Sequence, residues 1–180
     1  MDTIEQIQAI LSAARFAAEK HAGQRRKGDA AEPYVNHLIE VAELVAMALR
    51  EPDTNLVIAA LLHDSIEDAD VTADDLASRY GADVASLVSE VTDDKSLPKQ
   101  ERKRLQVEHA AKKTPRAQTI KLADKISNLR SMLSSPPAGW DFERRREYFV
   151  WARRVVDGLT APNPMLKAEF ESTFSKFDGL

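Results

Sequence analysis

Apolar residues recur at helical spacing along most of the chain, and this pattern predicts a series of separate helices. The apolar face of the first predicted helix consists of Ile4, Ile7, Leu11, Ala14 and Ala18. This helix is expected to stop at residues 21–23, and a polar loop follows over residues 24–33. A second helix is predicted over residues 34–50. The third is apolar on all sides over residues 56–62, which is typical of a helix at the centre of a fold.

Capping and proline signals place the remaining helices. Thr72 and Asp75 resemble a capping box that opens a short helix ending at Gly81, and another helix is predicted over residues 84–91. Three prolines stand at first helical positions, and with one further segment they predict helices over residues 98–112, 115–133, 141–159 and 164–177. No segment alternates like a strand. The sequence therefore predicts an all-α fold, a compact bundle of about eight to nine helices in a single domain over residues 1–180.

Composition narrows the possible chemistry. The 180 residues include 25 basic and 29 acidic side chains, a formal net charge of −4, and no cysteine. Disulfides, thiolate metal sites and cysteine nucleophiles are excluded, so any metal must be held by histidine and carboxylate groups. The mild acidity argues against binding of a nucleic-acid polymer, and no uncharged stretch is long enough to span a membrane. The charged N-terminal segment is unlike a secretory signal, and a cytoplasmic setting is expected.

Residues 61–70 hold the densest group of candidate catalytic side chains. If the third helix continues through them, His63 lies above Glu67 and Asp64 lies above Asp68. Carboxylates near a helix C-terminus cost about 0.3–1 kcal/mol each, and burying an unpaired one costs far more. A divalent cation would offset these costs. The alternative is that Asp64 only orients His63 and that the remaining acidic groups form a solvated helix end.

Two further residues are candidate partners for this segment. Asp124 is predicted on the apolar side of an amphipathic helix, away from the charged face of Lys121 and Lys125. A buried aspartate needs a partner, which could be a metal, one of these lysines or a backbone cap. His37 begins the second helix. Together with the pair at residues 63–64, these two residues would supply two nitrogens and two carboxylates, which suits Mn²⁺, Fe²⁺ or Zn²⁺.

Basic segments add a possible anion site. The cations at residues 25–27 precede His37 and would suit a phosphate-bearing ligand, although a solvated basic turn has the same composition. The cations at residues 144–146, with Tyr148 beyond them, fit either a ligand surface or a solvated helix face. His21 and His109 lie in charged surroundings and are predicted at the surface.

Taken in order, five motifs resemble a known family. They are Arg-Arg-Lys at 25–27, Tyr-Val-Asn-His at 34–37, His-Asp-Ser-Ile-Glu-Asp at 63–68, Val-Thr-Asp-Asp-Lys at 91–95 and Ala-Asp-Lys-Ile-Ser-Asn-Leu-Arg at 123–130. The set resembles the hydrolase domain of RelA/SpoT-type alarmone enzymes in its stand-alone form, within the HD-domain metal-dependent phosphohydrolases. The resemblance covers nearly the whole chain and implies an HD-type helical bundle. One departure is Leu38, where the family commonly has proline, which would only preset a helix start.

The resemblance implies an activity and a set of roles. The family removes the 3′-diphosphate of guanosine 3′,5′-bis(diphosphate) (ppGpp) or of its pentaphosphate relative (pppGpp) as pyrophosphate, leaving GDP or GTP, and usually uses Mn²⁺. The implied metal ligands are His37, His63, Asp64 and Asp124. The implied water-activating pair is Glu67 and Asp68. The implied substrate-binding residues are Arg26, Lys27, Lys99, Asn128, Arg144 and Tyr148. The expected partner is a small nucleotide, and the sequence gives no indication of the oligomeric state.

Two alternatives stay open at this point. The same site could act on another nucleotide, since stand-alone relatives are also credited with removing the 2′-phosphate of NADPH. A nucleotide-sensing HD module without turnover is the second alternative. The complete acidic pair of Glu67 and Asp68 argues against a sensor, because binding alone does not require it.

Overall fold

The computed structural model describes residues 2–177, and within that range the fold is all-helical, as the sequence predicts. The helices are α1 Thr3–Lys20, α2 Val35–Ala48, α3 Thr54–Leu61, α4 Ser65–Asp68, α5 Ala73–Tyr80, α6 Ala82–Val91, α7 Lys99–His109, α8 Pro115–Ser134, α9 Phe142–Asp157 and α10 Pro164–Phe174, with a 3-10 turn over Ala110–Lys112. The described part of the chain contains no strand, only two isolated bridges. No helix within it is long and apolar enough to cross a membrane.

Local signals in the sequence locate most helix ends correctly. Thr72 and Asp75 form the predicted capping box of α5, and both Pro115 and Pro164 occupy the first turn of their helices. The helix predicted over residues 98–112 is split, because its last turn is 3-10 rather than α. These ends are set by short-range hydrogen bonds, which is why local sequence predicts them.

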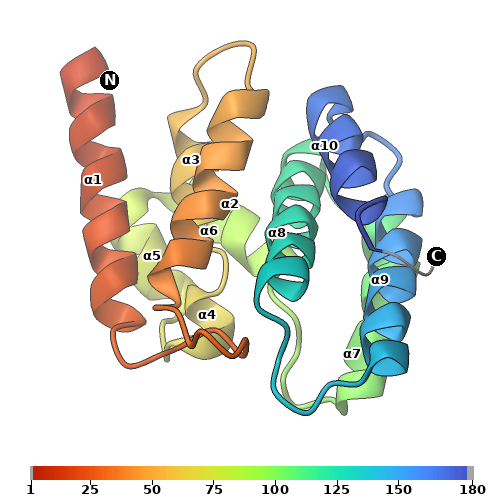
Figure 1. The fold of residues 1–180 in the computed structure, drawn as a ribbon. Coiled ribbons are helices and arrows are strands. Elements are labelled where there is room, and N and C mark those ends of the chain that lie inside the picture. The colour runs from red at the N-terminus through yellow and green to blue at the C-terminus, as the bar shows by residue number, and fades with distance from the viewer. Residues whose placement is uncertain (1, 178–180) are drawn as a thin grey trace.

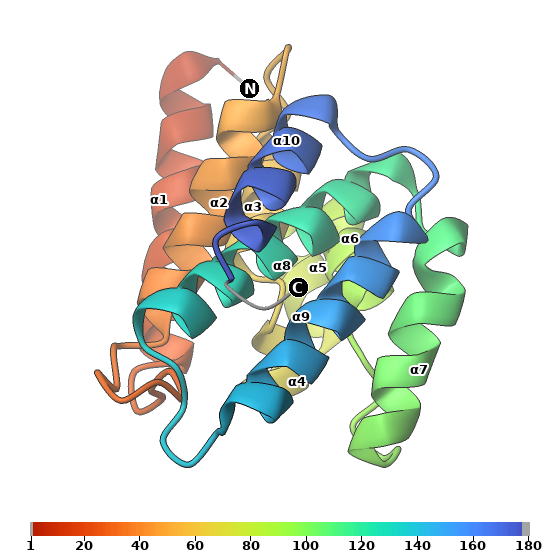
Figure 2. The same ribbon diagram turned by 45° about the vertical axis from the view of Figure 1, so that its right-hand side comes forward.

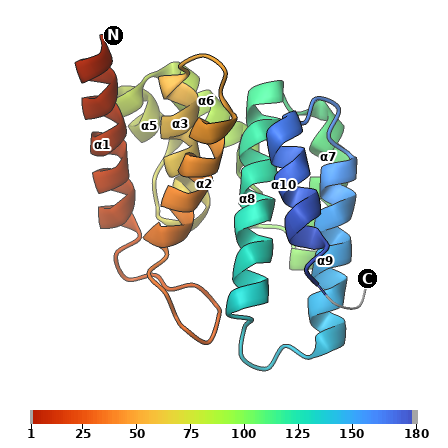
Figure 3. The same ribbon diagram turned by 45° about the horizontal axis from the view of Figure 1, so that its top comes forward.

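Helix α8 is the centre of the molecule. It packs against α2, α3, α6, α9 and α10, and in Figure 1 and Figure 3 it runs between one group of helices, α1 to α6, and a second group, α7, α9 and α10. The second group brings α7 and α9 side by side, as Figure 2 shows. Residues near the middle of α8 are therefore enclosed from several directions.

The burial of α8 corrects one prediction from the sequence. We expected a charged face on this helix, carried by Lys121 and Lys125. These residues are only 9% and 3% exposed, while Ile120 and Leu122 beside them are fully buried. Helix α3 agrees with its prediction, because every residue from Leu56 to Leu61 is buried. Helix α8 thus carries buried polar side chains as well as apolar ones, whereas the buried residues of α3 are all apolar.

The central position of α8 makes its apolar residues costly to truncate. Replacing the fully buried Leu122 with alanine should lower the free energy of unfolding by about 2–5 kcal/mol, because a cavity remains. The matched control is Leu11→Ala on α1, where the side chain is 63% exposed and the change should stay within about 0.5 kcal/mol. Urea denaturation measures both. Equal losses at the two sites would contradict the central placement of α8.

Candidate metal centre and adjoining pocket

Three helical segments bring two imidazoles and a carboxylate together in the interior. His37 lies on α2, His63 follows α3, and Asp124 lies in the middle of α8. One side-chain ligand atom from each lies within 4.8 Å of the others, and all three residues are buried. Asp124 Oδ1 is 3.4 Å from Nε2 of His37 and 3.9 Å from Nε2 of His63. This spacing leaves a common point among the three side chains where a cation could bind.

Asp64 adds a second carboxylate to this group. Its Oδ2 lies 3.1 Å from Nε2 of His63 and 3.7 Å from Nε2 of His37. The same oxygen accepts a hydrogen bond of 2.7 Å from the hydroxyl of Tyr34. Burial and the nearby Asp64 raise the pKa of Tyr34 far above its usual range, so the phenol stays a donor. All four residues expected from the sequence as metal ligands therefore meet in one place.

The chain reaches this arrangement through a break that we did not expect. The third helix does not continue through residues 61–70, the condition under which His63 would lie above Glu67, because α3 ends at Leu61 and α4 begins only at Ser65. His63 and Asp64 therefore lie in a turn rather than on a helix face shared with Glu67 and Asp68. The break leaves the carbonyl of Ala60 without the helical N–H partner that a continuous helix would give it. His63 Nδ1 lies 2.8 Å from that oxygen.

The hydrogen bonds of the two imidazoles suit metal binding. A carbonyl oxygen can only accept, so Nδ1 of His63 carries the proton and its Nε2 presents a lone pair. That Nε2 atom is buried and has no hydrogen-bond partner, although a buried polar atom normally has one. On His37, Nδ1 lies 2.8 Å from the hydroxyl of Ser127, which again leaves Nε2 toward the carboxylates. Two nitrogens and two carboxylates held in this way fit a divalent transition metal.

The pKa shifts of the candidate metal ligands have opposing physical causes. Burial lowers the pKa of His37 and favours the neutral ring that a metal requires. Burial also pulls the pKa of His63 down, but Asp64 and then Asp124 outweigh it, and the net shift is upward. Burial alone would raise the pKa of Asp124, yet Lys125 and His37 hold it well below its usual range. Burial alone would likewise raise the pKa of Asp64, but His63 and then His37 outweigh it and lower that pKa. Both carboxylates thus stay ionised in the interior.

Lys125 is a partner of Asp124, one of the alternatives that the sequence left open. Its ammonium donates to Asp124 Oδ2 at 2.8 Å, and the amide of Asn128 donates to Oδ1 at 2.6 Å. The ammonium also lies 4.8 Å from the centre of the Trp151 ring. The lysine does not replace a metal, because Oδ1 still faces the two histidines.

Glu67 and Asp68 lie on α4, at the edge of the same site. They line a cavity of about 290 Å³ together with His63, Asp64 and Asp124. Glu67 accepts hydrogen bonds of 3.3 Å from the backbone N–H of Asp93 and from Arg102. Burial and the nearby Asp93 and Asp64 carboxylates raise the pKa of Glu67. Asp68 pairs with the ammonium of Lys95.

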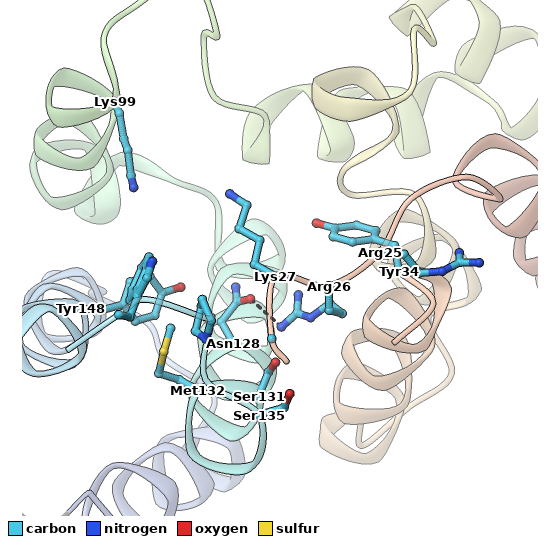
Figure 4. A pocket seen from close by; sticks show the side chains of 13 residues that line it. Arg25, Arg26, Lys27, Tyr34, Lys99, Asn128, Ser131, Met132, Ser135 and Tyr148 are labelled. Carbon is cyan, nitrogen blue, oxygen red and sulfur yellow. Dashed lines mark hydrogen bonds between the residues drawn. The ribbon is translucent and has the colours of Figure 1, made fainter. Parts of the chain in front are cut away.

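A basic pocket adjoins this cavity and shares several of its walls. Figure 4 shows the side chains of Lys27 and Lys99 projecting into it from opposite sides, with Arg26 bound to Asn128 through a hydrogen bond of 3.0 Å. Tyr148 lines the pocket as well. Burial and the neighbouring Lys27, Arg144 and Arg102 cations lower the pKa of Lys99, a sign of concentrated positive charge. Such a pocket suits an anionic ligand.

Arg144 is placed differently from the other predicted substrate-binding residues. It does not line the pocket itself. Its guanidinium lies 4.4 Å from the centre of the Trp140 ring, and Trp140 forms part of the wall. Arg144 is therefore at the rim, and its role stays a prediction.

The loop over residues 24–33, which carries the cations at residues 25–27, is fixed to the segment between α8 and α9. Gly28 forms a bridge with Pro137, and the N–H of Ala30 donates to the hydroxyl of Ser135. A Cβ atom at Gly28 would lie 2.1 Å from the carbonyl oxygen of Ser135, so only glycine allows this close approach. The loop thereby holds Arg26 and Lys27 over the end of α8.

Sequence reasoning placed His21 incorrectly and missed several residues of the site. His21 is buried, stacks on Tyr34 and binds Gln24, whereas His109 is exposed as predicted. The cavity around Glu67 also contains side chains to which the sequence assigned no role in the site, namely Arg102, Lys103, Gln106 and Trp151. Lys121 and Lys125 line this cavity as well, and for them the sequence signal was their position one turn and one residue from Asp124.

Comparisons with known proteins identify the family of this chain. A model of the HD domain family matches residues 13–152. The chain is 49% identical over 165 residues to guanosine-3′,5′-bis(diphosphate) 3′-pyrophosphohydrolase MESH1 of Drosophila melanogaster, covering 92% of each chain. It is 48% identical over 167 residues to MESH1 of Homo sapiens, covering 93% of each.

A solved structure gives the same relationship. A metazoan orthologue of SpoT, described as hydrolysing ppGpp, superposes with a TM-score of 0.90 at 47% identity, covering 96% of this chain and 97% of the other. The sequence, the fold and the site lead to one assignment. The chain belongs to the HD domain family and, within it, to the stand-alone MESH1-type hydrolases.

Proposed function

We propose that this protein removes the 3′-diphosphate of ppGpp or pppGpp as pyrophosphate, leaving GDP or GTP, in a metal-dependent reaction. The observation that carries the proposal is the convergence of His37, His63 and Asp124 beside a basic pocket. The metal-site candidate and the cationic walls together suit a substrate rich in phosphate. The names of the MESH1 relatives state the same activity for those proteins.

The proposed ligands are His37, His63, Asp64 and Asp124, and the proposed ion is Mn²⁺ or another divalent transition metal. The choice rests on the mixed nitrogen and oxygen donor set, which such ions accept. When bound, the ion would supply charge neutralisation at a phosphoryl oxygen and lower the pKa of a water molecule.

Glu67 and Asp68 are proposed to handle the water. The water oxygen bonds to the phosphorus attached to the ribose 3′-oxygen, and the bond between that phosphorus and the 3′-oxygen breaks. The proton that the water loses is balanced by the proton that the 3′-oxygen gains. Burial beside Asp93 and Asp64 raises the pKa of Glu67, which makes its carboxylate a stronger base for the water proton. Asp68 on the same short helix is proposed to orient the water.

The basic pocket is proposed to bind the rest of the substrate. Lys27 and Lys99 face each other across it and suit phosphate groups, while Arg26 presents a planar guanidinium. Asn128 binds Arg26 of the basic pocket and Asp124 of the metal-site candidate. It is therefore proposed to contact the ribose, which would lie between the pocket and the metal site. Arg144 and Tyr148 are proposed to contact distal phosphates from α9.

The direct test is incubation with ppGpp and Mn²⁺, with and without a chelator, followed by identification of the products. We expect GDP and pyrophosphate in equal amounts, and no turnover with chelator. Release of orthophosphate from NADPH with no cleavage of ppGpp would replace the proposal with a nucleotide phosphatase. Tight ppGpp binding without product in excess Mn²⁺ would replace it with a sensor.

Two substitutions separate water activation from metal binding. Glu67→Gln should lower kcat by about 10²–10⁴-fold, as loss of a general base does, and should keep Mn²⁺ affinity within about threefold. Asp64→Asn should lose Mn²⁺ affinity and activity together. Calorimetric Mn²⁺ titration and initial rates measure the two effects. A wild-type rate for Glu67→Gln would show that its assigned role is wrong.

The close approach of Gly28 to Ser135 predicts a binding defect. Gly28→Ala should raise the KM for ppGpp roughly tenfold, because relieving the clash displaces the loop that carries Arg26 and Lys27. The matched control is Gly23→Ala, since a Cβ atom there meets nothing within 4 Å. Steady-state kinetics measure both variants, and Mn²⁺ affinity should be unchanged in each. Equal KM values would argue against the loop as a binding element.

A further inference from the structure

The imidazole of His37 is connected to the protein surface by a chain of hydrogen bonds. Its Nδ1 lies 2.8 Å from the hydroxyl oxygen of Ser127, which in turn lies 2.6 Å from Oε2 of Glu40. We propose that Glu40, acting through Ser127, fixes His37 in the tautomer that presents Nε2 to the metal. Glu40 would then be a positioning residue. The inference rests on the proposed metal site, although it does not depend on the identity of the substrate.

The direction of these hydrogen bonds follows from counting protons. Ser127 has one hydroxyl proton, and both of its neighbours could accept it. The Glu40 carboxylate has no proton to give, whereas a neutral imidazole has one. Ser127 therefore donates to Glu40 and accepts from Nδ1–H of His37. Nε2 is left with its lone pair, directed toward Asp124 and Asp64 at 3.4 and 3.7 Å.

Arg130 holds the outer end of this chain. Its Nη1 donates to Oε1 of Glu40 at 2.8 Å, and its Nη2 donates to Glu169 on α10 at 2.8 Å. The side chain of Glu40 is 30% exposed and that of His37 is 1% exposed, so the chain runs from the surface into the core. Each carboxylate oxygen of Glu40 thus has its own partner, with Oε1 facing Arg130 and Oε2 facing Ser127.

The second histidine shows why this connection matters. His63 is fixed in the same tautomer by the carbonyl of Ala60, a backbone group that no side-chain substitution removes. His37 has no such carbonyl at its Nδ1, and Ser127 is the partner found there. A hydroxyl can donate or accept, so by itself it fixes neither tautomer. The Glu40 carboxylate therefore determines which ring nitrogen of His37 carries the proton.

Replacing Glu40 with glutamine should reverse the direction of the hydrogen bonds that link residue 40, Ser127 and His37. The glutamine carbonyl would face the Arg130 donor, and its amide nitrogen would therefore face Ser127. Ser127 would accept from that amide and donate to Nδ1 of His37. The ring proton would then be on Nε2, where it blocks metal binding. Ser127→Ala should be milder, because it removes the preference without imposing the wrong tautomer.

The experiment combines NMR with metal titration. Histidine ¹⁵N spectra of the metal-free full chain report which ring nitrogen carries the proton, and the chain has only 4 histidines. A His37→Gln variant identifies the His37 signals by their loss. We expect Nδ1–H in the wild type and Nε2–H in Glu40→Gln. Affinity for Mn²⁺ alone, measured by calorimetry, should fall at least tenfold in Glu40→Gln and less in Ser127→Ala.

Glu43→Gln is the matched control, since Glu43 is exposed on the same helix. It should change neither the tautomer nor Mn²⁺ affinity, and thermal melts show whether each variant is folded. The inference is overturned if wild-type His37 carries its proton on Nε2, or if folded Glu40→Gln keeps Nδ1–H and wild-type affinity. A wild-type protein that binds Mn²⁺ but does not cleave ppGpp would refute the proposed substrate and leave this inference standing.

Discussion

The structure depends on keeping two ionised carboxylates inside a helical core. Asp64 and Asp124 approach the same pair of imidazoles from different segments, and burial of such charges is strongly unfavourable without positive partners. Lys125 offsets one of them directly. The geometry can only form if α2, the turn after α3, and α8 meet at one point. The central placement of α8 is therefore a condition of the site as well as of the core.

Charge is distributed unevenly around this point. The chain carries a formal net charge of −4, yet the side chains that face the two cavities include a group of cations from three regions, namely Arg26, Lys27, Lys99, Arg102, Lys103, Lys121 and Lys125. A net negative surface with a local positive pocket disfavours a polyanion and favours a small anionic ligand that fits inside. The carboxylates of the metal-site candidate lie at the bottom of this positive region, where a metal and a phosphate could be held together.

Sequence patterns predicted the helices well because capping and apolar periodicity are local. They predicted the grouping of His37, His63 and Asp124 only by chemical argument and resemblance, since periodicity does not show which helices meet. Lys121 and Lys125 were expected on a charged helix face, but both are buried, which is rare for lysine. Lys125 pairs with its neighbour Asp124, but its burial also depends on the Trp151 ring, and that of Lys121 depends on Asp93. Trp151 and Asp93 come from other segments, which no local pattern reports.

The break between α3 and α4 shows most directly how local structure produces chemistry here. A continuous helix would use the carbonyl of Ala60 internally and would place Glu67 on the same face as His63. Ending α3 at Leu61 frees that carbonyl for the imidazole, and restarting at Ser65 gives Glu67 and Asp68 a separate orientation. Helix propensity does not predict this break, because Asp64 and Glu67 form hydrogen bonds with Tyr34, Asp93 and Arg102 from other segments. The break in the helix, where the sequence favours a continuous one, is thus the place where the candidate ligand His63 and the candidate bases Glu67 and Asp68 lie.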